Sequence, residues 1–171
     1  GAGFGTEGTS FGFAVSENNY MGKGIKLNAS LRLSEERITG LFQVINPNYN
    51  YTDNLLATTI RSTVTDRMED YGYKSTNTGF SLGTDFEQYE DFRISPTIAL
   101  GHEKLSTNQS ASSSLKKQEG SYIDASFSYG LDYDKRNQRF QTSEGFRSKF
   151  TQKLPIISED YALTSGYEFS K

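Results

Sequence analysis

The chain has 171 residues, enough for one domain, and carries a formal net charge of −3 at pH 7. This acidic balance argues against a nucleic-acid partner, which would require a basic stripe on the surface. Cysteine is absent, which excludes disulfides, thiolate chemistry and cysteine-based metal sites. Hydrophobic residues make up only 34% of the chain, yet aromatic residues reach 13%. Disordered chains are poor in aromatic residues, so this composition favours a β-protein in which every second residue is polar.

Apolar and polar residues alternate along most of the chain, with the period of a β-strand. No segment has a helical period, and the Ser-rich residues 106–120 predict a long mobile loop. The alternation predicts about ten strands joined antiparallel by turns. They are expected at residues 1–8, 10–17, 24–34, 38–46, 54–66, 77–87, 92–105 and 121–133, from residue 146 onward, and at 160–171.

Each predicted strand has one apolar and one polar face, and alternation alone does not say which face is buried. A soluble sandwich or lipocalin-like barrel buries its apolar face, whereas a membrane barrel turns that face towards lipid. Long strands, charged residues on the polar faces and aromatic residues near strand ends favour the membrane barrel. The charged residues include Lys26, Arg32, Arg61 and Arg93, and the aromatic residues include Tyr20, Tyr49, Tyr71, Tyr89 and Tyr133.

No set of residues predicts a catalytic or metal site, so we expect neither enzyme activity nor a cofactor. His102 is the one histidine in a chain without cysteine, and a zinc site needs several such ligands. Residues 3–8 match the pattern G-x-G-x-x-G, but a dinucleotide site also needs a preceding strand and a following helix. The residues that follow alternate as a strand, so we expect a glycine-rich strand and a tight turn instead.

The segment YDKRNQRFQTSEGFR at residues 133–147 resembles a turn between two barrel strands in the BamA (bacterial surface antigen) family of outer-membrane assembly factors. Two further segments resemble turns of that family in the same order, NYMGKG at residues 19–24 and NPNY at residues 46–49. Gln141 stands where the family commonly has proline. The residues that match the family-signature turn are Asp134, Arg136, Asn137, Phe140, Thr142, Gly145 and Arg147.

The resemblance implies an all-β fold, an antiparallel transmembrane β-barrel of about sixteen strands, of which this chain would supply roughly the first ten. The POTRA domains of the family would precede Gly1, and the last barrel strands would follow Lys171. Residues 1–171 are therefore expected to be the N-terminal part of an outer-membrane β-barrel domain.

The resemblance also implies a function, which is to fold and insert client proteins into the outer membrane of Gram-negative bacteria. In this family the first strand pairs weakly with the last, and a client strand can add to this lateral gate by β-augmentation. The implied partners are unfolded outer-membrane proteins, accessory outer-membrane lipoproteins, and lipid or lipopolysaccharide, with no nucleic acid. Glycine weakens strand pairing, and the gate strand here would comprise Gly1, Ala2, Gly3, Phe4, Gly5 and Thr6.

Three alternatives remain open at the level of sequence. The first is a TamA-type assembly factor or a two-partner secretion transporter of the same superfamily, which the missing amino-terminal domains would distinguish. The second is a plain porin or structural outer-membrane barrel, which would conduct ions without affecting barrel assembly. The third is a soluble lipid-binding β-barrel.

Overall fold

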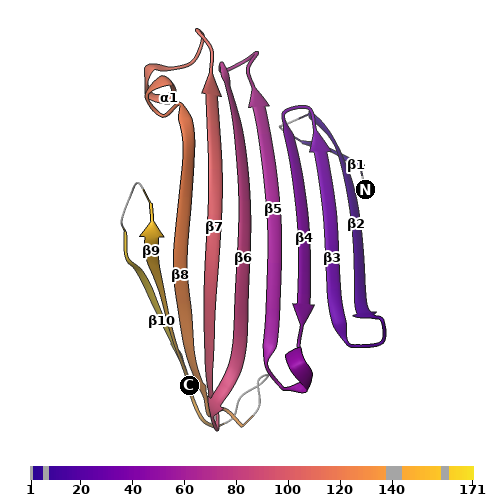
Figure 1. Cartoon of the computed structure of the whole chain (residues 1–171), viewed down its shortest axis with the longest axis vertical. Helices are drawn as coiled ribbons and strands as arrows, with labels where there is room; N and C mark the ends of the chain where they lie inside the picture. The colour runs from indigo at the N-terminus through magenta and orange to yellow at the C-terminus, as the bar shows by residue number, and fades with distance from the viewer. Residues whose placement is uncertain (1, 6–7, 138–143, 159–161) are drawn as a thin grey trace.

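A computed structural model describes residues 2–5, 8–137, 144–158 and 162–171 of the chain. These residues form a single sheet of ten antiparallel strands that follow one another in chain order (Figure 1). The prediction of an all-β, antiparallel fold is therefore confirmed. The strands are β1 (Ala2–Gly5), β2 (Gly8–Tyr20), β3 (Ile25–Ser34), β4 (Arg37–Asn46), β5 (Leu55–Arg67), β6 (Tyr73–Tyr89), β7 (Phe92–Thr107), β8 (Gly120–Asp134), β9 (Arg147–Ile157) and β10 (Thr164–Ser170).

The connections between strands alternate between two rims of the sheet, which are the upper and lower ends in Figure 1. The lower rim holds the β2–β3, β4–β5, β6–β7 and β8–β9 connections, and a 3-10 turn, η1 (Tyr49–Tyr51), lies in the second of these. The upper rim holds the β7–β8 connection, which contains the short helix α1 (Ser113–Lys117).

The helix α1 corrects the prediction that residues 106–120 form a loop without regular structure. Its N-cap is Ser112, whose side chain accepts a hydrogen bond from the backbone N–H of Leu115 at 3.3 Å. The loop is also attached to the neighbouring β5–β6 connection, because the Asn108 side chain donates to the carbonyl of Met68 at 3.2 Å. A serine-rich segment can thus supply its own cap, which composition alone does not reveal.

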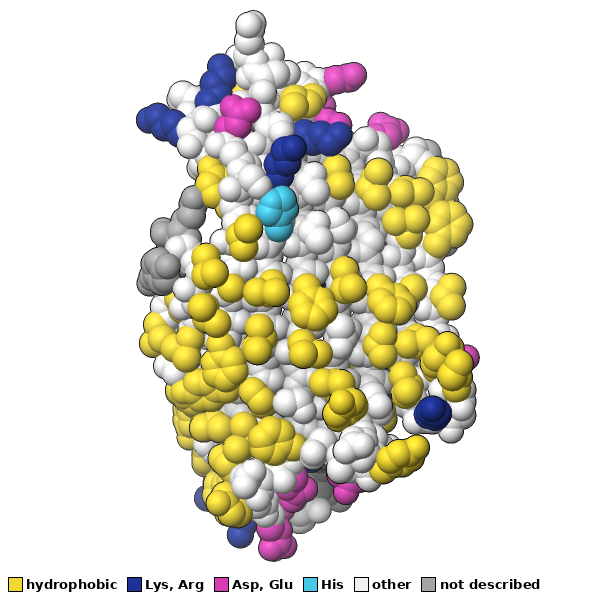
Figure 2. Space-filling view, viewed as in Figure 1, with side chains coloured by type: hydrophobic (Ala, Val, Ile, Leu, Met, Phe, Trp, Pro, Cys, Tyr) yellow, Lys and Arg dark blue, Asp and Glu magenta, His cyan; other side chains and the backbone are white. Residues whose placement is uncertain are grey.

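The strand register places the apolar residues of neighbouring strands on one face of the sheet, which we call the apolar face. Phe42 of β4 pairs with Ile60 of β5, and Ile60 pairs with Phe80 of β6. Phe80 in turn pairs with Leu100 of β7. The result is a band of hydrophobic side chains across the sheet, which Figure 2 shows on the side turned to the viewer.

Hydrogen bonds between side chains cross the opposite, polar face. Ser16 of β2 donates to Asn28 of β3 at 2.7 Å, and Asn28 donates to Gln43 of β4 at 3.3 Å. Gln43 continues the series by donating to Thr59 of β5 at 3.2 Å. These four side chains therefore satisfy part of their hydrogen-bonding capacity within the sheet.

The apolar face has no second layer of structure on it in the described part of the chain. Among the residues with a described side chain, the buried ones are Gly72, Leu105, Ala111, Ala125 and Ser126, too few to make a hydrophobic core. Large apolar side chains are exposed instead. They include Phe13 at 63%, Val15 at 71% and Ile123 at 64% relative exposure. An apolar surface of this extent requires a membrane or a partner to cover it.

The glycines of the sheet differ in how crowded their surroundings are. On the polar face, a Cβ added to Gly101 would lie 2.1 Å from Asp124 Oδ1, and one added to Gly83 would lie 2.8 Å from Thr97 Oγ1. On the apolar face, a Cβ added to Gly40 would meet nothing within 4 Å. Crowding is not uniform on the polar face, because a Cβ at Gly79 or Gly130 would have only ordinary contacts of 3.7 Å or more.

Candidate functional site

The predicted gate strand lies at one edge of the sheet. Its residues Ala2–Gly5 form β1, while Gly1 and Thr6 lie outside the described residues. The ladder with β2 pairs Gly3 with Ser10 and Gly5 with Gly8. On its other side, β1 faces no strand within the described part of the chain. A strand edge of this kind presents backbone N–H and C=O groups to which another strand can add.

The same segment excludes the dinucleotide geometry that its glycine pattern formally allows. Gly3 and Gly5 lie in β1, and Gly8 begins β2 with a φ of +80°. Of this pattern, the described residues fall on β1 and on the start of β2, so the segment that follows is a strand and not the helix whose N-terminus would bind a phosphate. The expectation of a glycine-rich strand is confirmed, while the turn expected between the two strands lies outside the described residues.

The family-signature turn lies between β8 and β9 at the lower rim, and its first part is held by the carboxylate of Asp134. Arg136 donates to both oxygens of this carboxylate, from Nε at 2.8 Å and from a terminal guanidinium nitrogen at 2.7 Å. The backbone N–H of Arg136 donates to the same carboxylate at 3.2 Å. The bond with Asp134 raises the pKa of Arg136 above its ordinary value. Charge-assisted, two-pronged bonds of this type fix the geometry of a turn as well as contributing energy.

The second part of the turn explains why glycine is needed at position 145. Gly145 has a φ of +104°, and a Cβ there would lie 2.2 Å from the carbonyl oxygen of Lys135. Two backbone bonds close the turn around it, from Lys135 N to Phe146 O at 2.9 Å and from Asn137 N to Glu144 O at 3.0 Å. The two remaining residues of the signature, Phe140 and Thr142, lie outside the described residues.

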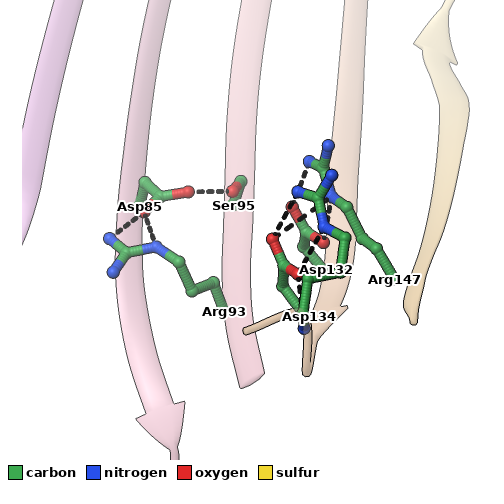
Figure 3. A network of polar contacts seen from close by, with 7 residues as sticks. Asp85, Arg93, Ser95, Asp132, Asp134 and Arg147 are labelled. Carbon is green, nitrogen blue, oxygen red and sulfur yellow. Dashed lines mark hydrogen bonds and ion pairs between the residues drawn. The ribbon is translucent and has the colours of Figure 1, made fainter. Parts of the chain in front are cut away.

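Arg147 begins β9 and binds a residue that the sequence did not single out. Its Nε donates to Asp132 Oδ1 at 2.9 Å, and a terminal nitrogen donates to Asp132 Oδ2 at 2.5 Å. Asp134 lies 4.0 Å from the same guanidinium, so the signature aspartate and Asp132 flank one arginine (Figure 3). The pairing of Asp134 with Arg147 across β8 and β9 brings these groups together.

A second polar cluster, also missed in the sequence, lies beside the first on the polar face. Asp85 of β6 accepts hydrogen bonds from Arg93 and Ser95 of β7 (Figure 3). Glu87 lies 3.9 Å from the same arginine. A sequence signal exists in retrospect, since Asp85 and Arg93 both occupy polar positions of strands joined by a tight turn. Both clusters link strands near the lower rim and thus reinforce the ends of the hairpins.

The other sites considered in the sequence concern His102 and a possible metal ion. His102 is exposed, and its Nε2 lies 2.7 Å from Ser121 Oγ. No group of three or more His, Asp or Glu side chains is placed to hold a metal ion within the described ranges. The described part of the chain also contains no helix with the length and hydrophobicity needed to span a membrane.

The register, the single layer and the two unlike faces define the wall of an antiparallel β-barrel. Residues 19–170 match the model of the Omp85 superfamily domain, and the chain belongs to the Omp85 superfamily. Among solved structures, the sheet is similar to that of BamA from Haemophilus ducreyi lacking POTRA domains 1–3, with a TM-score of 0.58 and 19% sequence identity. The match covers 91% of this chain and 33% of that chain, so this chain spans about a third of the BamA structure. The likeness establishes the fold, which is a segment of a BamA-type barrel.

Proposed function

We propose that residues 1–171 are the N-terminal part of the barrel of an outer-membrane assembly factor of the BamA type. The protein folds and inserts client β-barrel proteins through a lateral gate formed by β1. The observation that carries this proposal is the position of β1, a glycine-containing strand at the open edge of a barrel wall. In this role the protein pairs with client strands through hydrogen bonds and makes or breaks no covalent bond, so the proposed role is not enzymatic.

The physical argument for the gate rests on how a strand can exchange partners. Gly3 and Gly5 contribute no side chain to β1 and lose much conformational freedom on pairing, which weakens the ladder that they form. A client strand offers the same backbone hydrogen bonds as a barrel strand, so it can compete for a weakly paired edge. Deep in a bilayer the alternative to pairing is an unsatisfied backbone, which makes such an edge strongly receptive.

The apolar face supports a membrane location for the barrel. It exposes hydrophobic side chains on β2, β4, β5 and β7, and the polar face opposes it. Polar and charged residues would then line a wet interior, and the apolar band would contact lipid. We place the protein in the outer membrane of a Gram-negative bacterium, with unfolded outer-membrane proteins, accessory lipoproteins and lipid as its partners.

Crosslinking tests the gate directly. Cysteine is placed at Gly3 or at Gly5 in the full protein, and a client with cysteines in its strands is arrested during insertion. We expect disulfide adducts with the client at both positions. The matched control is Ser62→Cys in β5, whose two edges are both paired and which should give no adduct. An active complex that forms no adduct at Gly3 or Gly5 would contradict the assignment of β1 as the gate strand.

The same experiment separates this role from a porin or structural barrel and from other members of the superfamily. A barrel with no assembly role would capture no client at any position and would not affect barrel biogenesis when depleted. A TamA-type factor or a two-partner secretion transporter would capture a narrower set of substrates. The number of POTRA repeats encoded before Gly1 distinguishes these branches independently of the crosslink.

A further inference from the structure

We propose that a basic cluster on the apolar face, formed by Lys74, His102, Lys104 and Ser121, binds the phosphate of a membrane lipid headgroup. The inference rests on the proposed function only in that the apolar face must contact a membrane. It adds a lipid site that is separate from the gate strand. The cluster lies on β6, β7 and β8, far along the sheet from β1.

The strand register brings these residues together. Lys104 of β7 pairs with Thr76 of β6 on one side and with Ser121 of β8 on the other. Two residues before Lys104, His102 reaches the same row, because its Nε2 lies 2.7 Å from Ser121 Oγ. Lys74 pairs with Ser106, so it is the diagonal neighbour of Lys104. Two ammonium groups, an imidazole and the Ser121 hydroxyl thus share one patch.

The basic cluster lies along the strands at the level where the hydrophobic band ends. In a membrane this is the level at which lipid acyl chains meet the headgroups. On β7, Ile98 and Leu100 belong to the apolar band and are each 48% exposed. The next two outward positions are His102 and Lys104, both exposed. Figure 2 shows Lys and Arg side chains gathered above one part of the hydrophobic band, with several Asp and Glu side chains among them. A lipid packed on the band would therefore place its headgroup at the level of the cluster.

The ammonium group of Lys104 has no acidic partner among the described residues and can therefore bind an anion. No ion pair or hydrogen bond engages its ammonium group in the described part of the chain. Lys74 differs, because Asp66 lies 3.3 Å from its Nζ and both side chains are 47% exposed. Glu119, an acid of the same rim, accepts a hydrogen bond from Thr107 at 3.0 Å. The phosphate of a lipid is the complementary charge, and its oxygens can also accept from the neighbouring hydroxyl.

Lipid binding to the full protein in detergent tests this proposal by native mass spectrometry. The lipid probes are diphosphoryl lipid A, monophosphoryl lipid A and diacylglycerol, which has acyl chains but no phosphate, and inorganic phosphate is tested separately. We expect the affinity to fall in that order, and Lys104→Gln to weaken diphosphoryl lipid A binding about fivefold. Lys74→Gln should weaken binding by only about twofold, because Asp66 already offsets part of its charge. The matched control is Lys153→Gln, an exposed lysine on the polar face of β9 whose loss should leave binding unchanged.

Each contrary outcome overturns the proposal. Equal binding of the three lipids would show that acyl chains alone hold them. Inorganic phosphate binding as tightly as lipid A would identify a free-anion site. An equal loss from Lys153→Gln and Lys104→Gln would show a general charge effect. Because the assay involves no client, a failed gate crosslink with intact lipid binding would overturn only the gate, and the reverse result only the lipid site.

Discussion

The β8–β9 turn and the β1–β2 hairpin belong to one sheet but are held together in opposite ways. At the β8–β9 turn, Arg136 and Arg147 each bind an aspartate through two hydrogen bonds. In β1, Gly3 and Gly5 offer only backbone to β2. The comparison shows a wall whose strength differs from place to place. The gate proposed above would require one weakly paired seam, with the rest of the wall staying closed while that seam opens.

The largest change in the free energy of unfolding is expected in the β8–β9 turn, for Gly145→Ala. The new Cβ would collide with the Lys135 carbonyl at a positive φ, so we expect a loss of about 3 kcal/mol in the free energy of unfolding. Urea unfolding of the full protein in lipid vesicles measures it. Gly40→Ala is the control, since its Cβ meets nothing, and it should change stability by less than about 1 kcal/mol. Equal effects at the two glycines would contradict the role assigned to the turn.

A smaller loss in the free energy of unfolding is expected when the ion pair between Arg147 and Asp132 is broken. Arg147→Met leaves the Asp132 carboxylate, 23% exposed, without its partner, and should cost about 2 kcal/mol by the same urea assay. Adding Asp132→Asn should recover part of the loss, because the unpaired charge is then removed. The control is Lys74→Met, whose exposed pair with Asp66 should contribute about 0.5 kcal/mol or less. If Arg147→Met were as mild as the control, the network would not reinforce the wall.

The smallest change in the free energy of unfolding is expected for substitutions in β1. The same substitutions should change the rate of client insertion strongly. Gly3→Val together with Gly5→Val supplies strand-forming side chains and should stabilise β1–β2 pairing by up to about 1 kcal/mol. Hydrogen exchange of the β1 and β2 amides should slow, and the rate of client insertion should fall. The control Gly40→Val adds the same side chain to a central strand and should leave insertion unchanged. Faster insertion in the double variant would reverse the proposed role of the glycines.

The positions of the strands could be predicted because alternation is a local property. Residues 24–34 were expected as a strand, and β3 runs from Ile25 to Ser34. β6 (Tyr73–Tyr89) extends beyond its prediction of 77–87 at both ends. At the first end, the added residues Lys74, Ser75 and Thr76 are all polar, so the alternation does not continue into them. The helix α1 was missed because five residues held by one serine cap are too few to show a helical period.

The contacts across strands could not be predicted in the same way. Arg147 was known as part of a turn, but its partner Asp132 depends on the register of β8 against β9. That register shifts at an irregularity between Ala125 and Ser126, which no single strand reveals. The lateral gate itself remains a prediction, since it concerns what β1 does when a client arrives.

The crowded glycines of the polar face bear on how such a wall can change over evolutionary time. At Gly83 a methyl group would lie 2.8 Å from the hydroxyl of the β-branched Thr97, whereas at Gly40 on the apolar face it would meet nothing within 4 Å. Gly101 lies between these cases, because the atoms that a methyl group would meet there are the ends of the flexible Asp124 side chain. Larger residues are therefore expected to be accepted at Gly40 first, at Gly101 next and at Gly83 last.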